Sequence, residues 1–366
     1  MTDFGRRIAA AASAMSAAGI DALCVSVGSD LPYLTGYRAH ISERLTMLVL
    51  DGDGTATIVI PKLEAPRVQP RGRAFAVHPW EETDDPVGIV GQLVGRATRV
   101  AIGSQTWSRF ALALQAQDRR RSWVDAEDVM AGLRIVKSAG EISALRNAAT
   151  SVDRVADEIN EMRFSGRTEL DVAREITDRT IAAGHQSVEF CIVASGPNGA
   201  SPHHTASDRV IEVGDAIVVD FGGYQEGYCS DTTRMFVAGE PTADFKEAYA
   251  VLREAHASAV TFAGNWREVG HTASQIDAHA RQIIGAAGYG DRFIHRLGHG
   301  IGLDGHERPY LVDGDDTLIE PGMAFSIEPG IYTPGEWGMR IEDIVVVNDT
   351  GVESLNNSDR NLRVVS

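Results

Sequence analysis

Cysteine is scarce in this chain, and the few cysteines are far apart. The 366 residues include only Cys24, Cys191 and Cys229. Three widely spaced thiols indicate neither a disulfide framework nor a CxxC zinc motif. Long apolar runs are also missing: 43% of the residues are hydrophobic, yet no run approaches the roughly 20 residues that a membrane helix requires. We therefore expect a globular protein of the reducing cytoplasm that does not span a membrane.

Basic residues are too few for a nucleic-acid-binding protein. Lysine and arginine total 34 against 51 acidic residues, which gives a net charge of -17. This charge repels a phosphate backbone, so we expect no nucleic-acid partner. The pair Arg6-Arg7 before an alanine-rich stretch could imitate a secretion leader, but the stretch continues into a helix, turn and strand pattern. We predict that this stretch belongs to the fold.

The length of the chain predicts two domains, because single hydrophobic cores stop growing at roughly 250 to 300 residues. Residues 1–135 alternate helical stretches with short strand-like runs, which is typical of a smaller α/β domain with a mixed sheet. Residues 136–366 combine longer helices with strand-like runs bounded by glycine and proline, and predict an α+β domain with hairpins. A capping box of Ser138 and Glu141 begins a long helix at the predicted domain joint.

The second domain shows two further helix starts and several strands. A helix is expected from Thr168 to about 183, and another from Thr272 to Gly288. Strands are expected at 190–194, 216–220, 233–237, 323–327 and 341–347.

Two pairs of acidic residues lie on predicted hairpins. Asp220 and Asp231 flank a glycine-bearing turn, and antiparallel pairing would place them directly opposite each other, with Cβ atoms about 4.5 to 5.5 Å apart. Like charges at that distance repel unless a cation lies between them. Glu328 and Glu342 flank a second turn rich in proline and glycine, with Asp343 facing the other way. Taken alone, either pair could also be half-exposed acids in salt bridges.

His299 supplies the third part of a candidate metal site. Glycines at 298, 300 and 302 allow the backbone to come close to whatever His299 contacts. Four carboxylates and one imidazole form a hard, oxygen-rich site suited to a pair of manganese, iron, cobalt or zinc ions. Two such ions about 3.5 to 4 Å apart can bridge a water and lower its pKa toward neutrality, so the expected reaction is hydrolysis.

The motifs around these residues resemble those of a known family. VVDFGG, CSDTTR, GHGIGLDGHERP, FSIEPGIY and GMRIED are similar to motifs of the metallopeptidases with the pita-bread fold, which include methionine aminopeptidase, aminopeptidase P and prolidase. The ordered set, together with an N-terminal domain like that of creatinase and prolidase, covers essentially the whole chain. The resemblance therefore implies a pita-bread catalytic domain of the proline-specific branch, preceded by a creatinase-like domain.

The resemblance also implies how the metals are held. Asp220 and Asp231 would bind one ion, His299 and Glu328 the other, and Asp231 and Glu342 would bridge the two. Manganese is the expected metal, with cobalt, iron or zinc as alternatives. Glu328 would also transfer a proton between the bridging water and the leaving nitrogen.

The same resemblance assigns residues around the substrate. His203 and His306 would position the substrate and stabilise the tetrahedral intermediate, with His204 as the less favoured alternative to His203. The pocket for the proline ring would be lined by His295, Tyr332 and Arg340. The chain is expected to be a homodimer that acts on small peptides with proline at the second position.

Among the activities of this branch, we expect an Xaa-Pro dipeptidase that uses a bridging hydroxide on the dinuclear centre. Aminopeptidase P activity on longer peptides is the main alternative, because the cation that would hold a free substrate carboxylate is ambiguous: Tyr310 follows the HExP element, and Arg308 lies inside it. A hydrolase or lyase of the same fold acting on a non-peptide substrate is a further alternative. A non-catalytic binding module of this fold would not need all five metal ligands.

Overall fold

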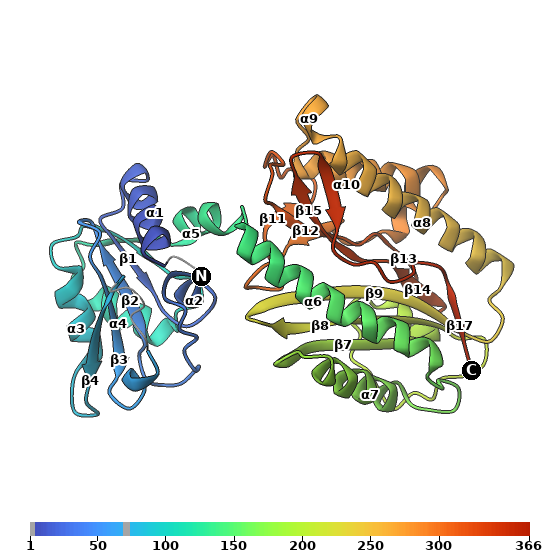
Figure 1. The fold of residues 1–366 in the computed structure, drawn as a ribbon, viewed down its shortest axis with the longest axis horizontal. Coiled ribbons are helices and arrows are strands. Elements are labelled where there is room, and N and C mark those ends of the chain that lie inside the picture. The colour runs from blue at the N-terminus through green and yellow to red at the C-terminus, as the bar shows by residue number, and fades with distance from the viewer. Residues whose placement is uncertain (1–3, 69–73) are drawn as a thin grey trace. The chain divides into compact units, whose positions relative to one another are not determined.

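The computed structural model describes residues 4–68 and 74–366, and the chain divides into two compact units. The N-terminal unit is Met1–Arg134 and the C-terminal unit is Ile135–Ser366. This division lies one residue before the boundary predicted from the sequence. Figure 1 colours the chain from blue at the N-terminus to red at the C-terminus.

A six-stranded mixed sheet organises the N-terminal unit, in the order β4-β3-β2-β1-β5-β6. Its strands are β1 (Ala22–Val25), β2 (Met47–Asp51), β3 (Ala56–Pro61), β4 (Ala76–Trp80), β5 (Arg99–Ile102) and β6 (Ser122–Asp125). Its helices are α1 (Phe4–Ala17), α2 (Asp30–Thr35), α3 (Pro86–Val94), α4 (Ser108–Gln117) and α5 (Glu127–Arg134), with a 3-10 turn η1 (Ala65–Arg67). β1 is antiparallel to β2 and parallel to β5, which confirms the predicted α/β domain with a mixed sheet.

The C-terminal unit is built from three groups of strands, in the orders β17-β9-β8-β7, β11-β10-β12-β15-β16 and β13-β14. The strands are β7 (Ser187–Ser195), β8 (Ala216–Gln225), β9 (Tyr228–Ala238), β10 (Gly298–Gly300), β11 (Glu307–Leu311), β12 (Ala324–Ile327), β13 (Gly330–Thr333), β14 (Trp337–Arg340), β15 (Asp343–Asn348), β16 (Gly351–Ser354) and β17 (Arg363–Val365). The helices are α6 (Ala139–Glu158), α7 (Glu169–Ala182), α8 (Ala243–Gly264), α9 (Trp266–Val269) and α10 (Ala273–Ala286), with 3-10 turns η3 (Ile159–Glu161), η4 (Gly196–Ala200) and η5 (Gly290–Arg292).

Helices α6, α7 and α10 begin where their capping residues predict. Ser138 and Glu141 form the complete capping box of α6, and Thr272 caps α10 in the same way. Thr168 caps α7 by accepting a hydrogen bond from the backbone N–H of Asp171 at 3.1 Å. Each side chain satisfies an N–H group that a helix otherwise leaves without a partner.

Strand β8 is buried on both faces, and its two faces pack against different hydrophobic cores. Val219 and Phe221 belong to the core that includes Val152 and Val155 of α6. Val218 belongs to a second core, with residues from α8 and α10. Because side chains alternate along a strand, Asp220 shares the face of Val218. Asp220, one of the predicted metal ligands, therefore lies on the face of the sheet that packs against the second core.

The register of the β8–β9 hairpin differs from the sequence prediction. Asp220 pairs with Thr233, and Asp231 pairs with Gly222, so the two aspartates are diagonal rather than directly opposed. The turn falls at Glu226 and Gly227, whose φ angles of 53° and 82° are both positive, as in a two-residue type I′ turn. This turn lies nearer to Asp231 than predicted. The diagonal arrangement keeps both aspartates on one face of the sheet.

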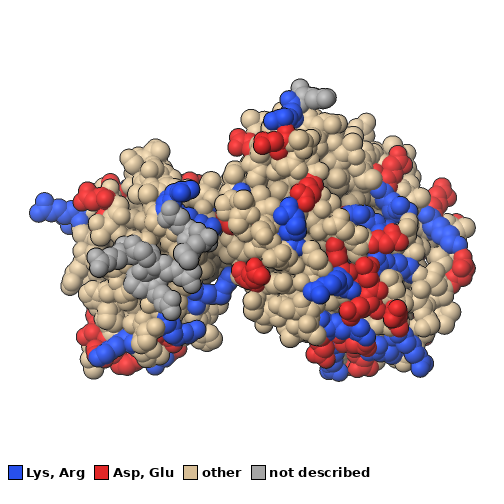
Figure 2. All heavy atoms as spheres, viewed as in Figure 1, with Lys and Arg blue, Asp and Glu red and all other residues tan. Residues whose placement is uncertain are grey.

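The surface of the C-terminal unit mixes charges of both signs. On α7, Glu175 forms ion pairs with Arg167 and Arg179 at 2.8 Å each. Figure 2 shows acidic and basic side chains side by side over the lower part of this unit, where α7 lies in Figure 1. Among the described helices, none combines the length and the apolar character needed to cross a bilayer.

Candidate metal centre and active site

Side chains from five strand segments converge on one spot of the C-terminal unit. Asp220 lies on β8, Asp231 on β9 and His299 on β10, while Glu328 follows β12 and Glu342 precedes β15. Three overlapping groups have ligand atoms within 4.8 Å of one another: Asp220, Asp231 and Glu342; His299, Glu328 and Glu342; and Asp231, His299 and His306. The structure thus brings together all five ligands predicted from the sequence and adds His306 at their edge.

His299 directs one ring nitrogen toward the carboxylates. Its Nδ1 lies 3.1 Å from the carbonyl oxygen of Gly300, and because a carbonyl only accepts, we assign the proton to Nδ1. The lone pair of Nε2 then faces Glu328 Oε1 at 3.2 Å and Asp231 Oδ2 at 3.8 Å. Carboxylates repel a lone pair unless a cation or a proton lies between them. This is the orientation expected of a metal ligand.

Glu342 lies in a gap between two strand ladders. The β12–β15 ladder ends just before Glu328, and the β13–β14 ladder begins two residues after it in the same register. Within the gap, the backbone N–H of Glu342 donates to the carbonyl oxygen of Thr233 on β9 at 3.2 Å. The hydroxyl of Thr233 donates to Glu342 Oε2 at 2.9 Å. The gap therefore brings Glu342 next to the aspartates of the β8–β9 hairpin.

Burial and mutual repulsion raise the pKa of the central carboxylates. Burial, followed by the charges of Asp220 and Glu328, holds the pKa of Asp231 well above its ordinary value. Burial, followed by the charges of Asp231 and Glu328, does the same for the pKa of Glu342. A cluster of this kind carries its full negative charge only when cations lie beside it.

The donor set fits divalent metal ions. Arg340 Nη2 donates to Asp220 Oδ2 at 2.5 Å, but Asp220 Oδ1 is buried and has no hydrogen-bond partner among the described residues. An unpaired buried acceptor costs about 1 to 3 kcal/mol, and more when it is charged. A cation would remove this cost, and hard carboxylate oxygens with one imidazole are suitable ligands for divalent ions.

The cluster lines a cavity of about 890 Å³ that also contains the other predicted active-site histidines. His203, His295 and His306 all line this cavity. The ring of His306 lies 3.8 Å from that of His299. Burial is the largest cause that lowers the pKa of His306, to about 4. At neutral pH His306 is therefore an uncharged imidazole that can donate one hydrogen bond.

Arg296 determines which nitrogen of His306 donates. Arg296 Nη2 lies 3.1 Å from His306 Nδ1, and because a guanidinium only donates, Nδ1 accepts and Nε2 carries the proton. The Arg296 guanidinium also lies over the ring of Tyr310 at 4.4 Å. Arg296 was not among the residues predicted from the sequence. Its position in the HRLGH segment, three residues before His299, was the available signal.

The three residues predicted to line a proline pocket form one hydrogen-bonded chain. Arg340 Nη1 donates to the hydroxyl of Tyr332 at 2.7 Å, and this hydroxyl lies 3.0 Å from His295 Nε2. His295 Nδ1 donates to the carbonyl oxygen of Arg296 at 2.7 Å. His295 and Arg340 line the cavity, and the buried Tyr332 holds them from behind. These three hydrogen-bonded side chains therefore form a wall beside the carboxylates.

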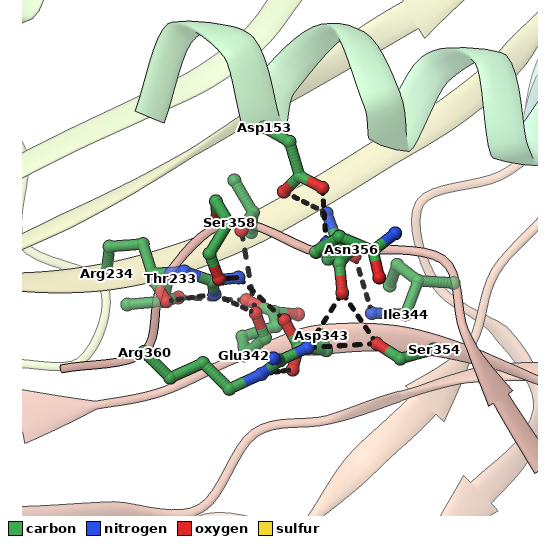
Figure 3. A network of polar contacts seen from close by, with 12 residues as sticks. Asp153, Thr233, Arg234, Glu342, Asp343, Ile344, Ser354, Asn356, Ser358 and Arg360 are labelled. Atoms are coloured by element: carbon green, nitrogen blue, oxygen red, sulfur yellow. Dashed lines mark hydrogen bonds and ion pairs between the residues drawn. The ribbon is translucent and has the colours of Figure 1, made fainter. Parts of the chain in front are cut away.

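A buried ionic network lies directly behind Glu342. Arg234 Nη1 donates to the carbonyl oxygen of Glu342 at 2.7 Å, and its Nη2 donates to Asp343 Oδ1 at 2.8 Å. Figure 3 shows Arg234 and Arg360 converging on Asp343. The alternation of side chains along a strand predicts that Asp343 faces away from Glu342. Asp153 of α6 joins this region by accepting from Asn356 at 3.3 Å. The backbone of Glu342 is thus held on the side away from the cavity.

The two-unit architecture and the acidic centre define the protein as a pita-bread metallopeptidase with a creatinase-like N-terminal domain. The chain belongs to metallopeptidase family M24. Residues 143–349 match the model of "Metallopeptidase family M24", and residues 7–136 match that of the "Creatinase/Prolidase N-terminal domain". The sequence-based recognition of this family and fold is confirmed.

Solved structures and a curated relative agree with this family. The crystal structure of dipeptidase PepE from Mycobacterium ulcerans is 44% identical, with a TM-score of 0.92, and the match covers 99% of this chain and 98% of that one. The prolidase from Thermococcus sibiricus is 35% identical, with a TM-score of 0.93 and full coverage of both chains (100% each). The Xaa-Pro dipeptidase of Lactobacillus delbrueckii subsp. lactis is 33% identical, covering 95% of each chain.

Proposed function

We propose that this chain is a cytoplasmic Xaa-Pro dipeptidase, active as a homodimer, with two divalent ions, manganese by preference. The observation that carries the proposal is the convergence of four carboxylates and one imidazole in the cavity. Similarity to proteins named as dipeptidases and prolidases supports the substrate class. The ions would be held by Asp220, Asp231, His299, Glu328 and Glu342.

Two divalent ions in this site would supply a nucleophilic water at neutral pH and a Lewis acid for the substrate carbonyl. Glu328 is suited to move the proton, because its carboxylate lines the cavity and Oε1 accepts from the hydroxyl of Ser326 at 3.0 Å. It would accept a proton from the attacking water and deliver it to the leaving proline nitrogen.

The histidines of the cavity would stabilise the reacting carbonyl. Arg296 leaves the Nε2–H of His306 as a donor, and His203 lines the same cavity. Donors held in place before the reaction stabilise the negative charge that develops on the carbonyl oxygen. A bond to proline carries no amide hydrogen, so recognition must rely on the carbonyl, the ring and the substrate termini. His295 and Arg340, which line the cavity, would contact the ring.

Aminopeptidase P activity is the second candidate, and the size of the cavity favours it. A volume of about 890 Å³ lies near the upper end of the range for ligand pockets, roughly 300 to 1,000 Å³. This is more room than a dipeptide fills. A longer peptide could therefore extend from the site.

We expect protein prepared with manganese to contain about two ions per chain and to cleave Ala-Pro. Elemental analysis and a peptide assay with Ala-Pro, Ala-Pro-Ala and Ala-Ala would measure this. Cleavage of the tripeptide would favour aminopeptidase P. A metal content near one ion per chain would refute the dinuclear centre. Cleavage of none of the peptides would indicate a non-peptide substrate for the same fold.

A further inference from the structure

Residues 195–207 form the first part of the connection between β7 and β8, and they carry His203 to the cavity. It begins at Ser195, continues through η4 and Pro202, and ends near Ser207. Both Pro202 and His203 line the cavity. A histidine on a connecting segment stabilises a transition state only when that segment is held in one conformation, because a misplacement of about 1 Å can cost roughly 100-fold in rate.

One buried carboxylate holds both ends of this segment. Glu169, in the first turn of α7, is fully buried, with an exposed fraction of 0%. Its Oε1 accepts from the backbone N–H and the hydroxyl of Ser195, both at 2.7 Å. Its Oε2 accepts from the backbone N–H of Ser207 at 3.1 Å and from its hydroxyl at 2.7 Å. Asn198 Nδ2 donates to both oxygens, at 3.0 and 3.1 Å.

His204 is part of the same set of contacts. Its Nε2 lies 2.8 Å from Glu169 Oε2, and because an ionised carboxylate only accepts, Nε2 donates. The side chain of His204 is therefore committed to Glu169. This leaves His203, the neighbouring residue, as the histidine of this segment that can serve the substrate.

The middle of the segment is held independently of Glu169. Arg340 Nη1 donates to the carbonyl oxygen of Pro202 at 3.3 Å. η4 also lies close to β14, because a Cβ added at Gly338 would be 1.8 Å from the carbonyl oxygen of Gly199. The segment is therefore fixed at its ends by Glu169 and at its centre by contacts beside the metal ligands.

We propose that Glu169 is a positioning residue for the reaction, which fixes segment 195–207 so that His203 faces the scissile carbonyl. This proposal rests on the proposed peptidase function. Burial alone would raise the pKa of Glu169, but the hydrogen bonds from Ser207, Ser195 and His204 outweigh it and lower the pKa to about 2. The carboxylate is thus ionised and fully engaged at neutral pH.

The experiment compares Glu169→Gln with the wild type, both loaded with manganese, on Ala-Pro. In either orientation a glutamine places an NH2 group against donors of the segment, while the backbone bonds from α7 to the carbonyl oxygens of Ser207 and Arg209 remain. We expect kcat to fall roughly 10- to 100-fold, with a much smaller change in KM. Hydrogen–deuterium exchange should become faster in residues 195–207 and stay unchanged in α10.

Four further variants test the role of Glu169. Ser207→Ala removes one donor to Glu169 without placing two donors against each other. It should also lower kcat, and it serves as the test if Glu169→Gln folds poorly. Glu169→Gln combined with His203→Ala should be no slower than His203→Ala alone, because both act through one group. Glu175→Gln is the matched control: it lies on the same helix, pairs only with Arg167 and Arg179 in its described ion pairs, and should retain the wild-type kcat.

The outcomes separate this inference from the function on which it rests. Additive effects of the two substitutions, or unchanged exchange in residues 195–207, would overturn the role of Glu169 even in an active peptidase. A wild-type protein that cleaves none of the peptides would refute the proposed function, and the role of Glu169 would fall with it.

Discussion

Asp231→Asn should lower kcat/KM on Ala-Pro by about a thousandfold or more while leaving the fold intact. Asp231 belongs to two of the three overlapping ligand groups, so its loss affects the binding of both proposed ions. Removing one group that stabilises the transition state typically costs roughly 100- to 1,000-fold, and removing a shared ligand should cost at least as much. Steady-state kinetics and elemental analysis of protein prepared with manganese would measure the effect.

The same substitution should stabilise the metal-free protein. The pKa of Asp231 is raised by burial and by Asp220 and Glu328, which means that its charge is less favourable in the folded than in the unfolded state at neutral pH. Asparagine removes that charge. We expect the Tm of the metal-free protein to rise, by roughly 2 to 4 °C for each kcal/mol of repulsion relieved. Added manganese should raise the Tm of the variant less than that of the wild type.

Asp171→Asn is the matched control, because Asp171 is an exposed aspartate on α7 that pairs with Arg174 at 3.4 Å. It should change neither activity nor the response to manganese. Wild-type activity in Asp231→Asn would remove this residue from the metal centre. A lower Tm of the metal-free variant would show that Asp231 stabilises the fold rather than opposing it.

Local signals were sufficient to predict several secondary-structure elements, although α8 was not among them. The capping pairs at Ser138 and Thr272 gave the starts of α6 and α10, because such side chains satisfy N–H groups in the first turn only. The β8–β9 hairpin was predicted, but its register was not. Two positive φ angles at Glu226 and Gly227 set that register, and a sequence with several glycines between the aspartates offers more than one place for such a turn.

The residues behind the proposed metal ligands were harder to predict. Asp220 and Glu342 stood out because each belongs to a pair of acidic residues that flanks a predicted hairpin turn, where like charges repel unless a cation lies between them. Glu169 did not, because a glutamate in the first turn of a helix is ordinary, and its partners at 195 and 207 lie far away in the sequence. Arg234 gave a weak signal as a charged residue within an apolar strand. Its partner Asp343 lies on another strand, and only the folded structure brings them together.

Arg234→Met should cause the largest loss of stability among single substitutions in the network of Figure 3. Arg234 and Asp343 are 1% and 0% exposed, and removing one partner of a buried ion pair costs about 3 to 5 kcal/mol because the other charge stays buried. Arg360 remains near Asp343, but it cannot replace the bond to the carbonyl oxygen of Glu342. Urea denaturation followed by circular dichroism would measure the loss.

The dependence on pH should change in the same variant. Burial alone would raise the pKa of Asp343, but Arg234 and His256 outweigh it and hold the pKa well below its ordinary value. A carboxyl with a lowered pKa stabilises the fold above its unfolded-state pKa, and this stability is lost as the pH falls toward the folded-state value. The free energy of unfolding of the wild type should therefore fall below about pH 4. Arg234→Met should show a weaker dependence there.

Arg174→Met is the matched control for Arg234→Met, since it replaces an exposed arginine whose ion pair with Asp171 spans 3.4 Å. Exposed pairs contribute about 0 to 1 kcal/mol, so the control should be close to the wild type in stability and in activity.

Arg234→Met should also lose activity, because Arg234 holds the backbone of Glu342 from behind. A variant as stable as the control would show that the network does not hold β9 to β15. A destabilised variant with full activity when folded would show that Glu342 keeps its position without Arg234.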